Sequence, residues 1–194
     1  MNKTLLIAGG VVLVIIIWFI SAQNGLVEQR ESIRKQLGQV DNVYQRRFDL
    51  IPNLVATVKG YASHEKELLE NVTRLRSQVG SIRVTPEMLE DPAAIQQYDQ
   101  LNSQLNSTLG RLLAVAESYP ELKANENFKM LQVQIEGSEN RIATERRRYN
   151  EYVGEYNTSI QLFPKSIVAS IGGFKAENYF KASSGAEQAP KVEF

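Results

Sequence analysis

Residues 46–65 read RRFDLIPNLVATVKGYASHE and place a proline inside a stretch that is otherwise helical in pattern. Apolar residues recur every three or four positions, which is the spacing of one helical face: Phe48, Ile51, Val55 and Val58. A proline in a helix interior removes one backbone hydrogen bond and clashes with the carbonyl four residues earlier, at a cost of about 3 kcal/mol. Because the pattern resumes at Leu54, we expect the helix to continue past Pro52 with a bend. A new helix that starts at Pro52 is the alternative.

The same spacing extends outward from this stretch. It predicts helices over residues 23–60, 64–79, 93–119 and 125–163. Asp91 and Asn125 precede two of these segments as N-caps, and a long loop is predicted over residues 79–94. Because the connection SYPELKANENF is short, the last two helices are expected to form an antiparallel hairpin.

The N-terminus is apolar enough to cross a membrane. No charge occurs between Lys3 and Glu28, and the apolar run from residue 5 to 20 comes close to the roughly 20 residues that a spanning helix needs. We therefore assign residues 1–25 to a transmembrane anchor that contacts the lipid bilayer through Leu5, Val14, Ile16, Trp18 and Ile20. A secretory signal peptide that is cleaved at Ala22 is the alternative.

The remaining chain divides into a helical bundle over residues 26–182 and a disordered tail over residues 183–194, whose composition is polar. Residues 167–180 are too apolar for water, so they are expected to pack against the bundle or to lie at a membrane surface. The predicted fold class is therefore all-α: an N-terminal transmembrane helix followed by an antiparallel bundle of long helices that resembles a four-helix bundle. Arg30, Arg34 and Lys35 outnumber Lys3 and favour a cytoplasmic domain.

Composition excludes several kinds of site. Lys+Arg and Asp+Glu are both 22, so no basic field favours nucleic acid, and the chain has no cysteine for disulfides or metal ligation. A carboxylate-bridged metal pair needs two histidines, whereas His64 stands alone. No glycine-rich phosphate loop occurs. We therefore expect no cofactor, no metal, no catalytic residue and no enzymatic activity.

One polar stretch, RIATERRRYNEYVGEYN, carries Arg146, Arg147 and Arg148 among glutamates. Mixed charges at helical spacing are typical of a solvated helix surface. The functional alternative is that some of these arginines, together with Arg46 and Arg47, pair with buried carboxylates or dock a partner.

Four blocks in order resemble the LemA family of bacterial membrane proteins: RRFDLIPNLVATVKGYASHE, RLLAVAESYPELKANENFKMLQ, SENRIATERRRYNEYVGEYN and FP…IGGF…YF. The resemblance covers about residues 45–180. It implies a helical bundle tethered to the bacterial inner membrane as a single-pass protein, and it transfers no catalytic residue. Some relatives are associated with magnetosome formation or encoded near membrane proteases. Residues of this chain that the family shares are candidate structural or interaction residues: Arg46, Arg47, Asp49, Pro52, Asn53 and Arg111.

These observations predict a non-enzymatic, membrane-anchored scaffold or adaptor that presents a helical surface to other membrane proteins, of which a membrane protease is one candidate. The alternative is a self-assembling protein that organises or remodels membranes, with homo-oligomers formed through the long helices. A hydrolase subunit would require a bound metal or a polar pocket.

Overall fold

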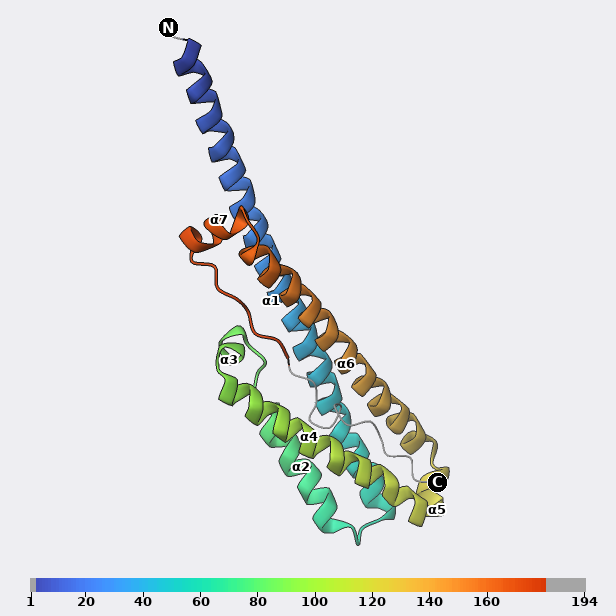
Figure 1. The fold of residues 1–194 in the computed structure, drawn as a ribbon. Helices are drawn as coiled ribbons and strands as arrows, with labels where there is room; N and C mark the ends of the chain where they lie inside the picture. The colour runs from blue at the N-terminus through green and yellow to red at the C-terminus, as the bar shows by residue number, and fades with distance from the viewer. Residues whose placement is uncertain (1–2, 181–194) are drawn as a thin grey trace, which may run out of the picture.

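The computed structural model describes residues 3–180, apart from a few side chains such as that of Leu5, and this part of the chain forms helices without a strand (Figure 1). The elements follow in the order α1 (Lys3–Tyr61), α2 (Lys66–Gly80), α3 (Pro86–Glu90), α4 (Pro92–Val115), the 3-10 turn η1 (Ala116–Ser118), α5 (Pro120–Ala124), α6 (Glu126–Gln161) and α7 (Lys165–Gly172). The all-α prediction is confirmed. The predicted tail, residues 183–194, and the end of the predicted bundle, residues 181–182, lie outside the described residues.

Helix α1 is the central element of the fold. It runs for 59 residues without a break, so the helix continues through Pro52 and the alternative of a new helix at that residue is wrong. Helix α6 packs along α1, while α2 packs between α1 and α4 (Figure 1). The predicted hairpin of α4 and α6 is therefore not a closely packed pair. The short connection brings the two helix ends together, but the apolar face of α6 packs mainly on α1 and that of α4 mainly on α2.

Helix boundaries follow local chemistry. The Asp91 side chain accepts a hydrogen bond from Ala93 N at 2.9 Å, and the Asn125 side chain accepts one from Phe128 N at 3.0 Å, so both predicted N-caps are confirmed. The predicted loop over residues 79–94 contains the short helix α3, whose cap Thr85 accepts a bond from Met88 N at 3.3 Å.

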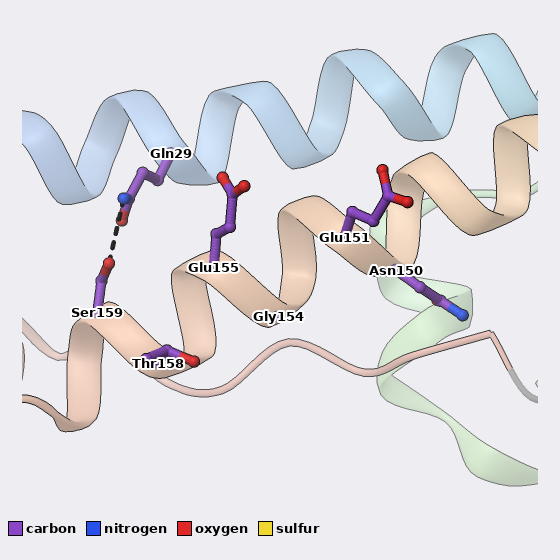
Figure 2. A pocket seen from close by; sticks show the side chains of 7 residues that line it. All are labelled: Gln29, Asn150, Glu151, Gly154, Glu155, Thr158 and Ser159. Atoms are coloured by element: carbon purple, nitrogen blue, oxygen red, sulfur yellow. Dashed lines mark hydrogen bonds between the residues drawn. The ribbon is translucent and has the colours of Figure 1, made fainter.

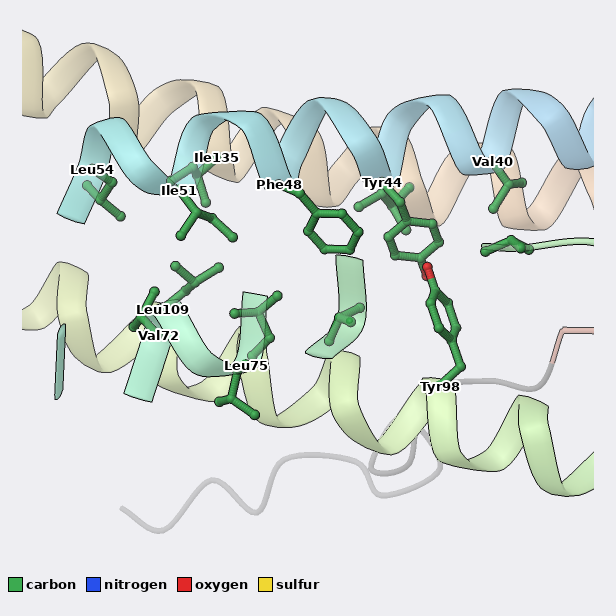
Figure 3. Close-up of a cluster of buried hydrophobic side chains, with 14 of the residues drawn as sticks. Val40, Tyr44, Phe48, Ile51, Leu54, Val72, Leu75, Tyr98, Leu109 and Ile135 are labelled. Carbon is green, nitrogen blue, oxygen red and sulfur yellow. The ribbon is translucent and has the colours of Figure 1, made fainter. Parts of the chain in front are cut away.

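One apolar core joins the four long helices (Figure 3). Its fully buried members include Val40, Ile51, Leu54, Val58, Val72, Val79, Leu105, Leu112, Tyr149 and Val153. Burying a side chain of this size stabilises a fold by about 1.5–3 kcal/mol. Val55, which the periodicity places on the buried face, is only partly buried, and Leu54 takes the core position.

The first turns of α1 extend beyond the bundle (Figure 1). Within the described residues α1 is the one helix long and apolar enough to cross a membrane. The predicted anchor residues Val14, Ile16, Trp18 and Ile20 have side chains that are 67%, 50%, 39% and 52% exposed, as lipid-facing residues would be in the absence of lipid. The Leu5 side chain lies outside the described part of the chain. No break in the helix marks the predicted boundary at residue 25.

Candidate functional site

Arg47 forms a polar site inside the bundle. Its side chain projects from α1 and is fully buried. Nη1 donates to Asn106 Oδ1 at 2.6 Å and to Glu139 Oε1 at 2.5 Å, and Nη2 donates to Asn102 Oδ1 at 2.6 Å. A buried guanidinium is costly unless it is paired and hydrogen-bonded, so these bonds hold α1, α4 and α6 in one relative position.

Neighbouring groups orient the partners of Arg47. Asn102 Nδ2 donates to the backbone carbonyl of Tyr98 at 2.9 Å, and Asn106 Nδ2 donates to Glu139 Oε2 at 3.2 Å. Each amide oxygen is thereby turned toward the guanidinium. Both Nη atoms of Arg47 thus bond to side chains of the same chain, of which Asn102 is buried, Glu139 is partly exposed and Asn106 is exposed.

Arg146 forms a second junction. Its Nη1 lies 3.3 Å from Asp99 Oδ1 and 3.3 Å from the Tyr44 hydroxyl, and its Cζ lies 4.8 Å from the centre of the Phe180 ring. The side chain is 14% exposed. Arg146 therefore joins α6 to α4, to α1 and to the segment that follows α7.

The two junctions share a register. On α4, Asp99 and Asn106 are seven residues apart, and their partners on α6, Arg146 and Glu139, are seven residues apart in the opposite direction. Seven residues are two helical turns, so α4 and α6 are antiparallel, as the sequence predicts, and meet through polar side chains.

Two tyrosines complete the aromatic surroundings of these arginines. The rings of Tyr44 and Tyr98 meet edge to face with centroids 5.3 Å apart (Figure 3). Burial raises the pKa of both phenols above the ordinary value, and for Tyr44 the nearby Arg146 and Arg47 partly oppose that shift. Both phenols therefore stay neutral at physiological pH.

The structure also explains Pro52. Since Pro52 has no N–H, the carbonyl of Phe48, four residues earlier, lacks its helical partner. Arg76 Nε of α2 donates to that carbonyl at 2.9 Å. The proline thus leaves an acceptor on α1 that α2 uses, a role that helical periodicity does not reveal because the donor lies 24 residues after the proline. The predicted bend stays a prediction.

The predicted interaction residues divide into buried and exposed sets. Arg47 and Arg146 lie at the junctions, whereas Arg46, Asp49, Pro52, Asn53, Arg111, Arg147 and Arg148 are exposed. On the surface of α6, Arg148 pairs with Glu145 at 2.9 Å and Arg147 lies 4.0 Å from Glu151. Asn102 and Asn106 are not among the residues predicted from the sequence, although an asparagine at position 102, on the same helical face as Leu105 and Leu109, is unusual enough to suggest a buried polar partner.

The C-terminal part of the described chain returns along α6. Gly173 adopts φ 67°, which ends α7 in the left-handed conformation that glycine tolerates. Asn157 then exchanges hydrogen bonds of 2.9 and 2.8 Å with the backbone of Glu177, and Asn150 exchanges bonds of 2.8 and 2.9 Å with the backbone of Phe180. We call these two side chains the asparagine clamps.

The spacing of the clamps follows from helix and strand geometry. Seven residues of helix rise about 10.5 Å, and three residues of extended chain span about 10 Å. The two asparagines on α6 therefore match two backbone positions of an extended segment. Of the two placements expected for residues 167–180, the stretch from Glu177 to Phe180 takes the one against the bundle, and the placement at a membrane surface stays a prediction.

A shallow hollow lies between α1 and α6 (Figure 2). Its lining comprises Gln29, Asn150, Glu151, Gly154, Glu155, Thr158 and Ser159. Gln29 Nε2 donates to Ser159 Oγ at 3.1 Å and bridges the two helices at one end. Across residues 3–180, no group of three or more histidine, aspartate or glutamate side chains is placed to hold a metal ion.

A model of the LemA family matches residues 36–194. The chain belongs to the LemA family. Magnetosome protein MamQ 2 of Paramagnetospirillum magneticum is 26% identical over 174 residues, which cover 81% of this chain and 64% of the relative. Magnetosome protein MamQ of Magnetospirillum gryphiswaldense is 26% identical over 173 residues with the same coverage. Protein LemA of Metamycoplasma hominis is 26% identical over 151 residues, which cover 78% of this LemA-family chain and 65% of the relative. The chain thus spans just under two thirds of the length of these relatives.

Proposed function

We propose that this LemA-family protein is a non-enzymatic scaffold or adaptor that is anchored in the bacterial inner membrane and presents a helical surface to other membrane proteins. The observation that carries the proposal is the continuity of α1, whose 59 residues run from the apolar segment into the centre of the bundle. At about 1.5 Å per residue such a helix is about 88 Å long. Anchor and binding domain would then form one stiff element.

Contacts of α7 support a retained anchor rather than a cleaved signal peptide. Ala22 is buried, and together with Leu26 it packs against Val168 and Ala169, with Phe19 beside them. Cleavage after Ala22 would remove two of the α1 side chains that cover α7. A segment that contributes to packing in this way is better explained as part of the mature protein.

The outer stripe of α6 is the surface that best fits a protein partner. Its exposed members recur at helical spacing and face away from the core: Met130, Val133, Arg141, Arg148 and Tyr152. Methionine, arginine and tyrosine are enriched at protein interfaces, where a few such residues carry most of the binding energy. This composition supports helix-to-helix docking on α6.

The test is photo-crosslinking of the full-length protein in its own membrane, with the crosslinking residue at position 133. A stoichiometric protein partner is expected, and Arg141→Glu should reduce its yield at least several-fold. Lys59→Glu is the matched control, because it reverses one exposed charge outside the outer stripe. A chain that lacks residues 5–18 keeps the α1 contacts of α7 and should lose the partner. Crosslinks only to lipid and to other copies of the chain would overturn the adaptor.

That second outcome would favour the other candidate, a self-assembling protein that organises membranes. Its support is the name of the relatives, magnetosome protein, and the exposed apolar residues beside α7. Liposome deformation by the purified full-length chain distinguishes this candidate from an adaptor.

A further inference from the structure

Four large apolar side chains are exposed around α7. Leu162 and Phe163, in the turn before the helix, are 59% and 81% exposed, and Ile167 and Ile171 are 49% and 70% exposed. Ile167 and Ile171 are four residues apart and therefore share one face of α7. Leu162, Phe163, Ile167 and Ile171 are called the outer apolar group below.

The opposite face of α7 fixes the position of this group along α1. Val168 and Ala169 are buried against Ala22 and Leu26, with Phe19 and Phe174 packed against the same cluster. The ring of Phe174 is in turn covered by Arg30, whose Cζ lies 5.3 Å from the ring centre. The helix is held against α1, so the outer apolar group cannot turn inward without giving up these contacts.

The contact with α1 places α7 at one end of the apolar segment. A hydrocarbon core of about 30 Å corresponds to about 20 residues of helix. Counted from Leu6, that length ends close to Leu26, and the next residues include the first charge after Lys3, Glu28. A helix that packs on residues 19–26 therefore lies at the level where hydrocarbon gives way to lipid headgroups. In Figure 1, α7 lies beside α1 just where the helix leaves the bundle.

Charges around α7 fit the same location. Lys165, the first residue of α7, and Lys175, shortly after its end, are exposed, and no acidic residue occurs between Glu155 and Glu177. Short amphipathic elements that lie in the membrane interface combine apolar side chains with lysine or arginine at the headgroup level. A protein partner is less favoured for the outer apolar group, because α7 packs on residues 19–26, at the end of a segment that is itself suited to lipid.

We propose that the outer apolar group inserts into the headgroup boundary and gives the protein a second membrane contact beside its transmembrane helix. This inference rests on the membrane anchor of the proposed function. One helix alone leaves a protein free to tilt and to rotate about the helix axis. A second contact at α7 restricts both motions, and it would direct the outer stripe of α6 to a defined side.

The experiment uses the full-length chain in vesicles of phosphatidylcholine and phosphatidylglycerol. Because the chain has no cysteine, single nitroxide labels can be attached at Ile171→Cys, Leu162→Cys, Ile15→Cys and Val133→Cys. Collision rates of each label with oxygen, which concentrates in lipid, and with a nickel chelate, which stays in water, are measured by electron paramagnetic resonance. Val133, 67% exposed on α6, is the matched control for an exposed apolar residue away from the membrane.

The inference predicts that labels at positions 171 and 162 collide several-fold more with oxygen than with the nickel chelate, as the label at position 15 does, and that the label at position 133 shows the reverse. Nickel-accessible labels at positions 171 and 162, with a lipid-embedded label at position 15, would overturn the second contact and leave the anchor standing. Labels shielded from both reagents would show that protein covers α7, which also overturns the lipid contact. A nickel-accessible label at position 15 would overturn the anchor and the inference together.

Discussion

At the scale of single residues, adjacent arginines have opposite environments. Arg46 is exposed, whereas Arg47 is buried among Asn102, Asn106 and Glu139. Helical periodicity separates neighbouring residues by about 100° around the axis, so one faces solvent while the next faces the core. Arginine is therefore expected to contribute to the stability of the fold at position 47 but hardly at position 46.

Replacement of Arg47 by alanine should destabilise the fold by about 3 kcal/mol, because the buried amide oxygen of Asn102, the amide oxygen of Asn106 and a partly exposed carboxylate lose their donor. Urea unfolding of the full chain in detergent micelles measures the change. Arg46→Ala is the matched control and should change the free energy of unfolding by no more than about 0.5 kcal/mol. An equal loss of unfolding free energy in Arg47→Ala and Arg46→Ala would contradict a stabilising role for the hydrogen bonds of Arg47.

The buried phenols predict alkaline sensitivity. Burial raises the pKa of Tyr44 and Tyr98 above 10.0 in the folded chain, so above that pH the unfolded chain releases protons first. The free energy of unfolding should stay level below about pH 10 and then fall by up to about 1.4 kcal/mol per pH unit for each tyrosine. Tyr98→Phe should make the decline shallower, whereas Tyr152→Phe, at an exposed position, should leave it unchanged. Urea unfolding between about pH 9 and pH 11 measures the slope.

At the scale of elements, Pro52 links two helices rather than only shaping one. The Phe48 carbonyl that it leaves without a helical donor accepts a bond from Arg76 of α2. In the parent chain Arg76→Ala should destabilise by about 1 kcal/mol through loss of that bond. In a Pro52→Ala background the new N–H of residue 52 can donate to the Phe48 carbonyl. The loss of unfolding free energy caused by Arg76→Ala should then be smaller by about 0.5 kcal/mol or more.

A double-mutant cycle from urea unfolding tests this coupling, and strict additivity of the two substitutions would contradict it. A structure of Pro52→Ala that shows the same helix axis as the parent would separately remove the predicted bend.

The asparagine clamps hold an extended segment to α6 through hydrogen bonds between their side-chain amides and the backbone of the segment. Asn157→Ala removes both bonds to the backbone of Glu177, and hydrogen exchange of that residue's amide should accelerate by about tenfold, equivalent to about 1.4 kcal/mol. Asn140→Ala, at an exposed site on the same helix, should leave the exchange rate unchanged. Unaltered exchange in Asn157→Ala would show that the segment is held by Phe180 packing instead.

At the scale of the whole molecule, the long α1 places the two ends of the apolar segment on opposite sides of any membrane it crosses. The charges Arg30, Arg34 and Lys35 predict a cytoplasmic bundle. A membrane-impermeant maleimide should therefore label Lys3→Cys in intact cells and label Met130→Cys only after permeabilisation. The reverse pattern would place the bundle outside the cytoplasm.

The sequence by itself determined the long helices, two of their caps, the apolar segment and the family, because each depends on local spacing or on residues that are close along the chain. It predicted that the helix passes Pro52 and that Asp91 and Asn125 are caps. Only the tertiary structure decided that α6 packs on α1 while α4 packs on α2, that Arg47 is buried and Arg146 largely so, and that Arg76 donates to the Phe48 carbonyl. Periodicity shows which face of a helix is apolar, but it contains no information about which distant face will cover it. That choice depends on the free energy of packing the whole chain at once.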